Sequence, residues 1–175
     1  NIETDEEYEI DTLILATGFD AMTGALTNLD IVGRNGIILR DQWKQGAKSY
    51  LGLGVSNFPN LFTITGPGSP SVLSNMMPSI EQHVNWIADC IGWMIDNNKS
   101  VIESSLAAEE EWMDLVNEIA GMTIFKSTES WYNGSNIDSK AKAFLPFIGV
   151  PVYTEKLEEI TSNNYQGFIF DTSNK

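Results

Sequence analysis

The sequence is poor in the residues that build metal sites, disulfides and nucleic-acid-binding surfaces. Its 175 residues include one cysteine, Cys90, one histidine, His83, and only 10 lysines and arginines against 24 aspartates and glutamates. A single cysteine excludes an intrachain disulfide and a metal site built from several thiolates. The formal net charge of −14 argues against nucleic acid and anionic membrane surfaces as partners, because both select basic patches.

Long apolar runs are missing as well. No segment approaches the roughly 20 consecutive apolar residues that cross a bilayer, and no secretory leader is visible. The chain is nevertheless 42% hydrophobic, and its length suffices for one globular domain with its own core. We therefore expect a cytoplasmic protein that has no membrane partner.

A complete glycine-rich nucleotide-binding fingerprint, G-x-G-x-x-G, is also absent. The nearest match begins at Gly52, but Asn57 replaces its third glycine, and Phe58-Pro59 follow instead of a helix. We expect a loop there rather than a phosphate-binding turn. A Ser-His-Asp hydrolase is rejected too, because there is one possible base and no nucleophile elbow.

The most informative segment that is present is 11–20, DTLILATGFD. Its apolar residues Leu13 to Ala16 run into Thr17-Gly18 without polar alternation, which is typical of a strand buried on both faces of a parallel sheet. Gly18 would let the backbone turn sharply or approach a ligand closely. The sheet to which this strand should belong is not present in the sequence.

Hydrophobic periodicity and turn residues predict the remaining elements. Strands are expected at 36–40, 49–51, 60–65 and 167–170, and helices from Pro78 to Asn97, from 105 to 122 and from 152 to 162. The first helix is predicted to bury Ile80, Val84, Ile87, Ile91 and Met94. The second is predicted to bury Trp112, Leu115, Ile119 and Met122.

Acidic residues are clustered at 3–9, 109–111 and 155–159. We interpret these clusters as solvated surface, with an acidic docking patch as the alternative. The acids that begin the second helix would also interact favourably with its dipole.

The segment from 66 to the start of the first helix predicts a ligand site. The turn Gly66-Pro67-Gly68-Ser69-Pro70 follows a buried-strand candidate and leads into a helix N-terminus. Ligands of α/β folds bind in such loops, and the unpaired amides of a helix N-terminus favour negative charge. The alternative is an ordinary strand-to-helix connection.

A second candidate is Trp131, which lies in a polar, Gly/Ser/Asn-rich stretch at 126–144. An indole in such a loop can cover a ligand and donate one hydrogen bond, although most tryptophans of a small domain are core residues. We interpret His83 and Cys90, both inside the first predicted helix, as structural residues, and the pattern predicts no metal site.

The segment from Ser56 to Ile87, SNFPNLFTITGPGSPSVLSNMMPSIEQHVNWI, closely resembles the Baeyer–Villiger monooxygenases, above all those of the phenylacetone monooxygenase type. The segment DTLILATGFD resembles a signature shared by flavoproteins that have two dinucleotide-binding domains. The Trp131 loop resembles the mobile control loop of the family, although Asp138 and Ser139 replace its usual Pro-Gly.

The resemblance implies a set of binding residues. Those matching cofactor-binding positions are Gly18, Gly66, Pro67, Asn75, Met76, Met77 and Trp131. Those matching the substrate pocket are Ser71, Val72 and Leu73. No catalytic residue is implied within this chain, because the catalytic arginine of the family lies upstream of the ATG motif, and Arg34 and Arg40 match nothing in its active site.

The fold class implied is α/β: an incomplete sheet plus helices, forming the C-terminal part of the FAD-binding domain of a flavoprotein with two dinucleotide-binding domains. Residues 1–17 would end the NADPH-domain sheet and cross over, and residues 18–175 would belong to the FAD domain, with the control loop near 126–144. The implied parent uses FAD and NADPH to insert oxygen from O₂ next to a ketone carbonyl, giving an ester or lactone.

Two alternatives remain: a related flavin-dependent N- or S-oxygenase, and a non-catalytic domain of flavoprotein ancestry. Because the glycine-rich fingerprints are missing, we expect the isolated chain to be an inactive C-terminal fragment that does not retain FAD. We also expect self-association through exposed strand edges, since apolar residues such as Leu13 and Leu61 would lack their neighbouring strands.

Overall fold

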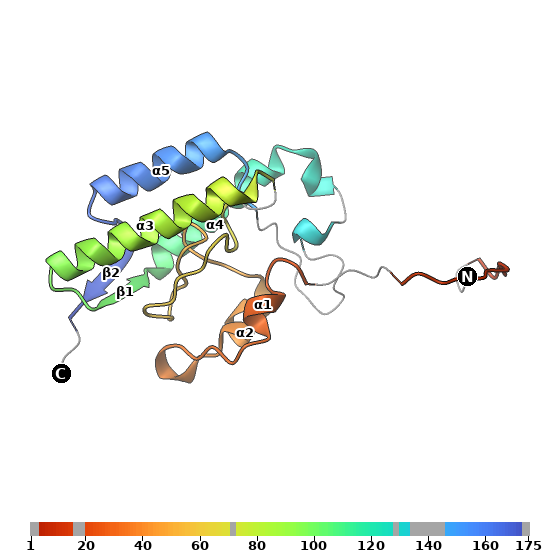
Figure 1. The fold of residues 1–175 in the computed structure, drawn as a ribbon, viewed down its shortest axis with the longest axis horizontal. Helices are drawn as coiled ribbons and strands as arrows, with labels where there is room; N and C mark the ends of the chain where they lie inside the picture. The colour runs from red at the N-terminus through yellow and green to blue at the C-terminus, as the bar shows by residue number, and fades with distance from the viewer. Residues whose placement is uncertain (1–3, 16–19, 71–72, 128–129, 134–145, 173–175) are drawn as a thin grey trace.

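The computed structural model describes residues 4–15, 20–70, 73–127, 130–133 and 146–172 (Figure 1). Its longer helices are α3 (Met76–Asp96), α4 (Leu106–Gly121) and α5 (Val150–Ser162), and its strands are β1 (Val101–Ser104) and β2 (Phe168–Asp171). Two short helices, α1 (Gly24–Thr27) and α2 (Leu39–Gln42), precede them. Single 3-10 turns occupy Arg34–Gly36, Trp43–Gln45, Ile124–Ser127 and Trp131–Asn133.

The long helices begin and end where the sequence indicates. Asn75 caps α3 by accepting a hydrogen bond from the Met77 amide (3.1 Å), and Ser105 caps α4 in the same way through the Ala108 amide (3.2 Å). Pro151 occupies the first turn of α5, where its missing N–H costs nothing. The three predicted helices and the C-terminal strand are therefore confirmed, with bounds shifted by a few residues.

The sheet differs from the prediction. Among the described residues it has two strands only, β1 and β2, which pair antiparallel with Ile102 opposite Phe170. Strand β1 was not predicted. The fold is thus mixed α and β, but no parallel sheet is present in the described part of the chain.

Three of the predicted strands, all between residues 36 and 65, do not form. Leu39 begins helix α2 instead of lying in a strand at 36–40. The segments at 49–51 and 60–65 contribute only isolated bridges, in which Gly54 pairs with Tyr50 on one side and with Phe62 on the other. Glycine turns allow this tight three-way arrangement, since Gly52 lies at φ +74° between the first two bridge partners.

The N-terminal segment 4–15 extends away from the rest of the molecule (Figure 1). The predicted strand at 11–17 is absent over its described residues, where Leu13, Ile14 and Leu15 are exposed. An extended chain needs paired neighbours to become a strand, and no neighbour is present in the described structure. Gly18 lies outside the described residues.

The main core lies between α3, α4 and α5, with α3 and α5 side by side across it (Figure 1). Aromatic rings dominate it: Trp112 stacks on Phe147 at 4.9 Å between ring centroids, and Trp86 packs edge-on against Tyr165 at 5.2 Å. A hydrogen bond from the Trp86 indole to Thr161 (3.0 Å) ties α3 to α5. Among the described residues, no helix is long and apolar enough to span a bilayer.

A second, smaller core gathers around α2. Its buried members are Leu39, Trp43, Ala47, Val55 and Phe58, with residues from α1 packed at its edge. This cluster holds residues 20–61 together and joins the main body through the segment 50–58.

The buried face of α3 is offset from the predicted one. Its buried residues are Ser79, His83, Trp86, Cys90 and Met94. Of the predicted stripe only Met94 is buried, whereas Val84 and Ile91 are exposed. In α4 the prediction holds for Trp112 but fails for Met122, which is exposed, while Met113, Val116 and Ala120 are buried.

Candidate functional site

The candidate site is the connection from Gly66 to Met77, which leaves the segment 62–65 and enters α3. Its first half, Gly66 to Pro70, is wholly buried. Its second half emerges toward solvent, with Asn75 and Met77 exposed at the first turn of α3. A buried support therefore carries an exposed candidate binding segment.

The backbone groups of the buried half form hydrogen bonds with other parts of the chain. The Gly66 amide donates to the Gly52 carbonyl (3.2 Å), and the Trp112 indole N–H donates to the Gly68 carbonyl (3.0 Å). Ser49 Oγ donates to the Pro67 carbonyl, and the Phe147 amide donates to the Ser69 carbonyl (2.8 Å). Three separate parts of the chain, the segment 49–52, Trp112 and Phe147, thus fix the conformation of this turn.

Close backbone approaches explain the glycines. A Cβ on Gly66 would lie 2.8 Å from the Gly52 carbonyl oxygen, and a Cβ on Gly52 would lie 2.4 Å from Ser69 Cβ. Gly68 has φ +85° and faces Trp112 Nε1 at 2.9 Å from its notional Cβ. Larger residues would push the turn out of this packing.

The structure places the predicted binding residues unevenly. Gly66 and Pro67 lie in the buried support, and Leu73 is half-buried against the main core. Asn75, Met76 and Met77 form the start of α3, where the positive end of the helix dipole lies. Ser71 and Val72 lie outside the described residues.

Trp131 lies in the 3-10 turn Trp131–Asn133 and is partly exposed. Its ring packs on Tyr132 with centroids 4.3 Å apart, and Tyr132 packs edge-on against Phe125 at 5.7 Å. Tyr132 and Leu73 both pack against the main core, so the described part of the Trp131 loop is anchored on the body that carries the candidate site.

His83 anchors the segment that precedes the buried turn. The Thr65 amide donates to His83 Nδ1 (2.9 Å), so that this nitrogen carries no proton and the neutral ring is protonated at Nε2. Nε2 lies 2.7 Å from the Tyr153 hydroxyl, which donates to the Leu51 carbonyl (2.6 Å). Burial lowers the pKa of His83 to about 4.

This network confirms the structural interpretation of His83. The ring is fully buried and both of its nitrogens are engaged, so it cannot exchange protons with a ligand. Cys90 is likewise a buried free thiol, and burial raises its pKa to about 12. Neither residue offers an acid, a base or a nucleophile near neutral pH.

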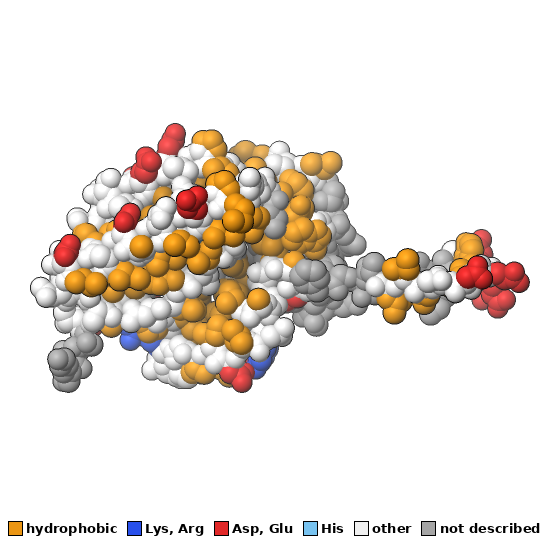
Figure 2. Space-filling model, in the orientation of Figure 1, with side chains coloured by type: hydrophobic (Ala, Val, Ile, Leu, Met, Phe, Trp, Pro, Cys, Tyr) orange, Lys and Arg blue, Asp and Glu red, His pale blue; other side chains and the backbone are white. Residues whose placement is uncertain are grey.

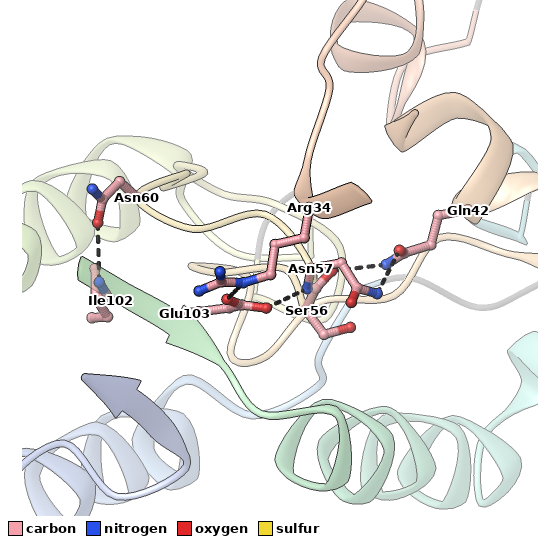
Figure 3. A network of polar contacts seen from close by, with 7 residues as sticks. All are labelled: Arg34, Gln42, Ser56, Asn57, Asn60, Ile102 and Glu103. Carbon is pink, nitrogen blue, oxygen red and sulfur yellow. Dashed lines mark hydrogen bonds and ion pairs between the residues drawn. The ribbon is translucent and has the colours of Figure 1, made fainter. Parts of the chain in front are cut away.

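A polar frame that the sequence did not reveal holds residues 56 and 57 (Figure 3). Glu103 of β1 accepts hydrogen bonds from Arg34 Nε (2.5 Å) and from the backbone amide of Asn57 (2.8 Å). Gln42 Oε1 accepts a hydrogen bond from the side-chain amide of Asn57 (3.0 Å), and Gln42 Nε2 donates to the Ser56 carbonyl (3.1 Å). Asn57, at φ +71°, is held in the left-handed region by these contacts.

Glu109 completes this frame from helix α4. It accepts hydrogen bonds from the Ser56 amide (2.8 Å) and the Ser56 hydroxyl (2.9 Å) and is only 1% exposed. Burial raises the pKa of this carboxyl group, while the two hydrogen bonds from Ser56 oppose the rise. Its interpretation as a solvated acid is therefore wrong, whereas Glu110 beside it is exposed.

Both arginines of the chain have acidic partners. Arg34 pairs with Glu103, and Arg40 lies 3.6 Å from Asp30. Within the described part of the chain, no cluster of three or more His, Cys, Asp or Glu residues could hold a metal ion.

A groove of about 640 Å³ opens between α4 and α5. Its polar lining includes Glu111, Asp114 and Glu118 of α4 and Lys156 of α5. None of the predicted binding residues lines it. The acidic lining does not suit an anionic cofactor.

Comparisons with known proteins identify the class to which this geometry belongs. No family model matches the chain. The chain is 39% identical over 168 residues to cyclohexanone 1,2-monooxygenase of an Acinetobacter species. This match covers 95% of this chain and 31% of that protein. It is 40% identical over 164 residues to phenazine N-monooxygenase PhzNO1 of Lysobacter antibioticus, covering 93% of this chain and 30% of that protein.

A solved neighbour, OTEMO in complex with FAD and NADP, has a TM-score of 0.86 and 33% identity over 95% of this chain and 31% of its own. The fold is therefore similar to part of a monooxygenase that was solved with FAD and NADP. More specifically, the chain is homologous to the Baeyer–Villiger monooxygenases and spans about 31% of the length of these relatives. The resemblance found in the sequence is confirmed.

Proposed function

We propose that this chain is part of an FAD- and NADPH-dependent Baeyer–Villiger monooxygenase that inserts oxygen next to a ketone carbonyl to give an ester or lactone. Its similarity to cyclohexanone 1,2-monooxygenase over 95% of the chain carries this proposal. In the proposed enzyme, residues 1–17 end the NADPH-domain sheet, and residues 18–175 form the C-terminal portion of the FAD domain. We place the enzyme in the cytoplasm, in keeping with its single buried thiol.

The exposed start of α3 suits a flavin in its charge. Asn75 caps this 21-residue helix and Met77 lies in its first turn, so both are at the positive end of the helix dipole. The pyrimidine edge of a reduced flavin carries negative charge, which such a pole stabilises. FAD, when bound, would supply the redox chemistry that activates O₂, and the protein would orient and enclose it.

We assign supporting roles to Gly66 and Pro67. Because their backbone groups bond inward to Gly52 and Ser49, these residues hold the turn that presents the following binding residues. Ser71, Val72 and Leu73 would then line the ketone pocket. Trp131 would cover the nicotinamide cofactor and substrate, and Gly18 would lie close to a cofactor.

The described residues of this chain would bind and position rather than transfer protons. His83 and Cys90 are buried, and Arg34 and Arg40 are paired with acids. The catalytic arginine expected in this family would come from the part of the enzyme outside these 175 residues.

A second candidate function is oxygenation of a ring nitrogen. The 40% identity to phenazine N-monooxygenase PhzNO1 supports N-oxygenation. The 39% identity to cyclohexanone 1,2-monooxygenase supports ketone oxygenation to a similar degree. Both functions use the same supporting turn, so the pocket residues near Leu73 would decide between them.

The test is product analysis with the full-length polypeptide that carries this chain, purified with FAD. With cyclohexanone, NADPH and O₂, we expect a lactone that contains one added oxygen atom. With phenazine, we expect no N-oxide. An N-oxide without any lactone would establish the second function, and neither product from a flavin-loaded enzyme would refute both.

Trp131→Ala tests the assigned covering role in the same enzyme. We expect lactone formation to fall at least about tenfold, while peroxide release driven by NADPH persists, because a closing contact positions both ligands. Thermal stability should change by less than about 0.5 kcal/mol, as for other surface-loop changes. Unfolding many degrees earlier with normal oxygenation per folded molecule would instead make Trp131 a core residue.

A further inference from the structure

Helix α3 carries a second apolar stripe on the face that points away from the core. Its members recur at spacings of 3, 4, 4, 3 and 4 residues: Met77, Ile80, Val84, Ala88, Ile91 and Ile95. Val84 is 46% exposed, Ile91 43% and Ile95 69%. An orange band follows α3 in the space-filling view (Figure 2). We call these six residues the outer stripe.

The outer stripe is distinct from the buried face of the same helix. The core takes Ser79, His83, Trp86, Cys90 and Met94, whose side chains alternate with the outer stripe along the sequence. A surface helix has one apolar stripe, whereas a helix that is apolar on two sides belongs inside a larger body. The outer stripe therefore has no packing partner among the described residues of this chain.

The segment 62–65, which lies beside α3, also has an exposed apolar residue. Ile64 is 46% exposed, although the next residue, Thr65, is hydrogen-bonded to His83 of α3. Exposed apolar residues thus lie on two elements that contact each other, α3 and the segment that precedes the buried turn.

Charge disfavours a second copy of this chain as the partner. Glu81, Asp89 and Asp96 are exposed on the polar side of α3, and the whole chain carries a net charge of −14. Two copies packed through this face would bring together two chains that both carry a large negative charge, and such like-charge association is unfavourable.

The relatives provide a better partner. The match to cyclohexanone 1,2-monooxygenase covers only 31% of that protein, so most of such a chain lies outside these 175 residues. We propose that the outer stripe of α3 is an intramolecular docking surface, covered by that remaining part of the monooxygenase chain. The covering face would be apolar opposite the six residues of the outer stripe.

This proposal rests on the part of the proposed function that places the chain in a longer monooxygenase, but not on the substrate. Its test therefore uses stability rather than oxygenation. We would introduce Val84→Asp and Ile91→Asp, singly, into the isolated chain and into a chimera. In the chimera these 175 residues replace the homologous segment of the Acinetobacter enzyme. Asn85→Asp adds the same charge to the polar side of α3 and is the matched control.

In the isolated chain, all three variants should melt within about 2 °C of the parent, because the positions are exposed. In the chimera, Val84→Asp and Ile91→Asp should lower Tm by about 8 °C or more, because they place a charge in an apolar interface. Asn85→Asp should stay near the parent in both. If the chimera does not fold, the same changes go into the aligned positions of the Acinetobacter enzyme.

Two results would overturn the proposal. Equal, small changes in both backgrounds would mean that the outer stripe stays exposed in the longer protein. A concentration-dependent dimer of the isolated chain that Val84→Asp converts to a monomer would assign the surface to a second copy. Loss of lactone formation with a normal stability pattern would count against the proposed function only.

Discussion

At the scale of single residues, the candidate site depends on two buried ionisable side chains that the sequence did not mark as special. His83 stays neutral because the Thr65 amide occupies Nδ1, and charging the ring would require this amide to lose its acceptor. Glu109 is buried against the Ser56 amide and hydroxyl. Each ties α3 or α4 to the backbone that leads to the binding segment.

His83 should make the stability of the chain dependent on pH. Its pKa in the folded state is lowered to about 4 by burial, below the unfolded value of about 6.5. The unfolded state therefore binds the proton more readily, so stability is complete above about pH 6.5 and is lost as pH falls toward about 4. Urea unfolding should show that the free energy of unfolding falls by about 3 kcal/mol between about pH 6.5 and about pH 4.

The control for this prediction is His83→Gln. Glu109 has a raised pKa and contributes in the opposite direction, so the comparison between parent and variant isolates the histidine contribution. The difference in unfolding free energy between the two proteins should shrink from pH 7 to pH 4. A constant difference across that range would contradict the neutral assignment of the ring.

Glu109→Ala should destabilise the chain strongly. It would leave the buried Ser56 amide and hydroxyl without their acceptor, at a cost of about 2–4 kcal/mol. The matched control is Glu110→Ala, next to it on the exposed side of α4, which should change stability by less than about 0.5 kcal/mol. Chemical denaturation of both variants measures the contrast, and equal effects would refute the role of Glu109.

At the scale of elements, glycine packing fixes the turn beneath the binding segment. Gly52→Ala should cost about 3 kcal/mol or more, because φ is +74° and a Cβ would collide with Ser69 at 2.4 Å. Gly36→Ala is the control: φ is +79°, but nothing lies within 4 Å of its Cβ, so only about 1–2 kcal/mol of backbone strain is expected. Similar losses of stability in both variants would mean that backbone conformation, not packing, is decisive.

At the scale of the whole molecule, the isolated chain should retain no FAD. It carries a supporting turn and a helix N-terminus, but no glycine-rich fingerprint whose amides would hold the diphosphate. After incubation with FAD and gel filtration, we expect no flavin absorbance in the protein peak. A stoichiometric flavin band would show that these 175 residues contain a complete cofactor site.

The sequence by itself determined the family, the three long helices and the C-terminal strand. Helix caps such as Asn75 and Ser105 are local signals, since each depends on residues two or three positions away. The motif from Ser56 to Ile87 likewise needs no tertiary contact to be recognised. Local hydrogen bonding and motif similarity can be judged along the chain, so these predictions were confirmed.

Only the tertiary structure decided which apolar residues are buried and which polar ones support the site. Val84 and His83 are neighbours in α3, yet the core takes His83, because the Thr65 amide and the Tyr153 hydroxyl satisfy both ring nitrogens. The predicted strands at 36–40 and 49–51 did not form, because each makes only a single isolated bridge, Ile38 with Val32 and Tyr50 with Gly54, and not a continuous ladder. Partners and burial depend on residues distant in sequence, and a periodic pattern along one helix does not specify which of its two apolar faces the rest of the chain will cover.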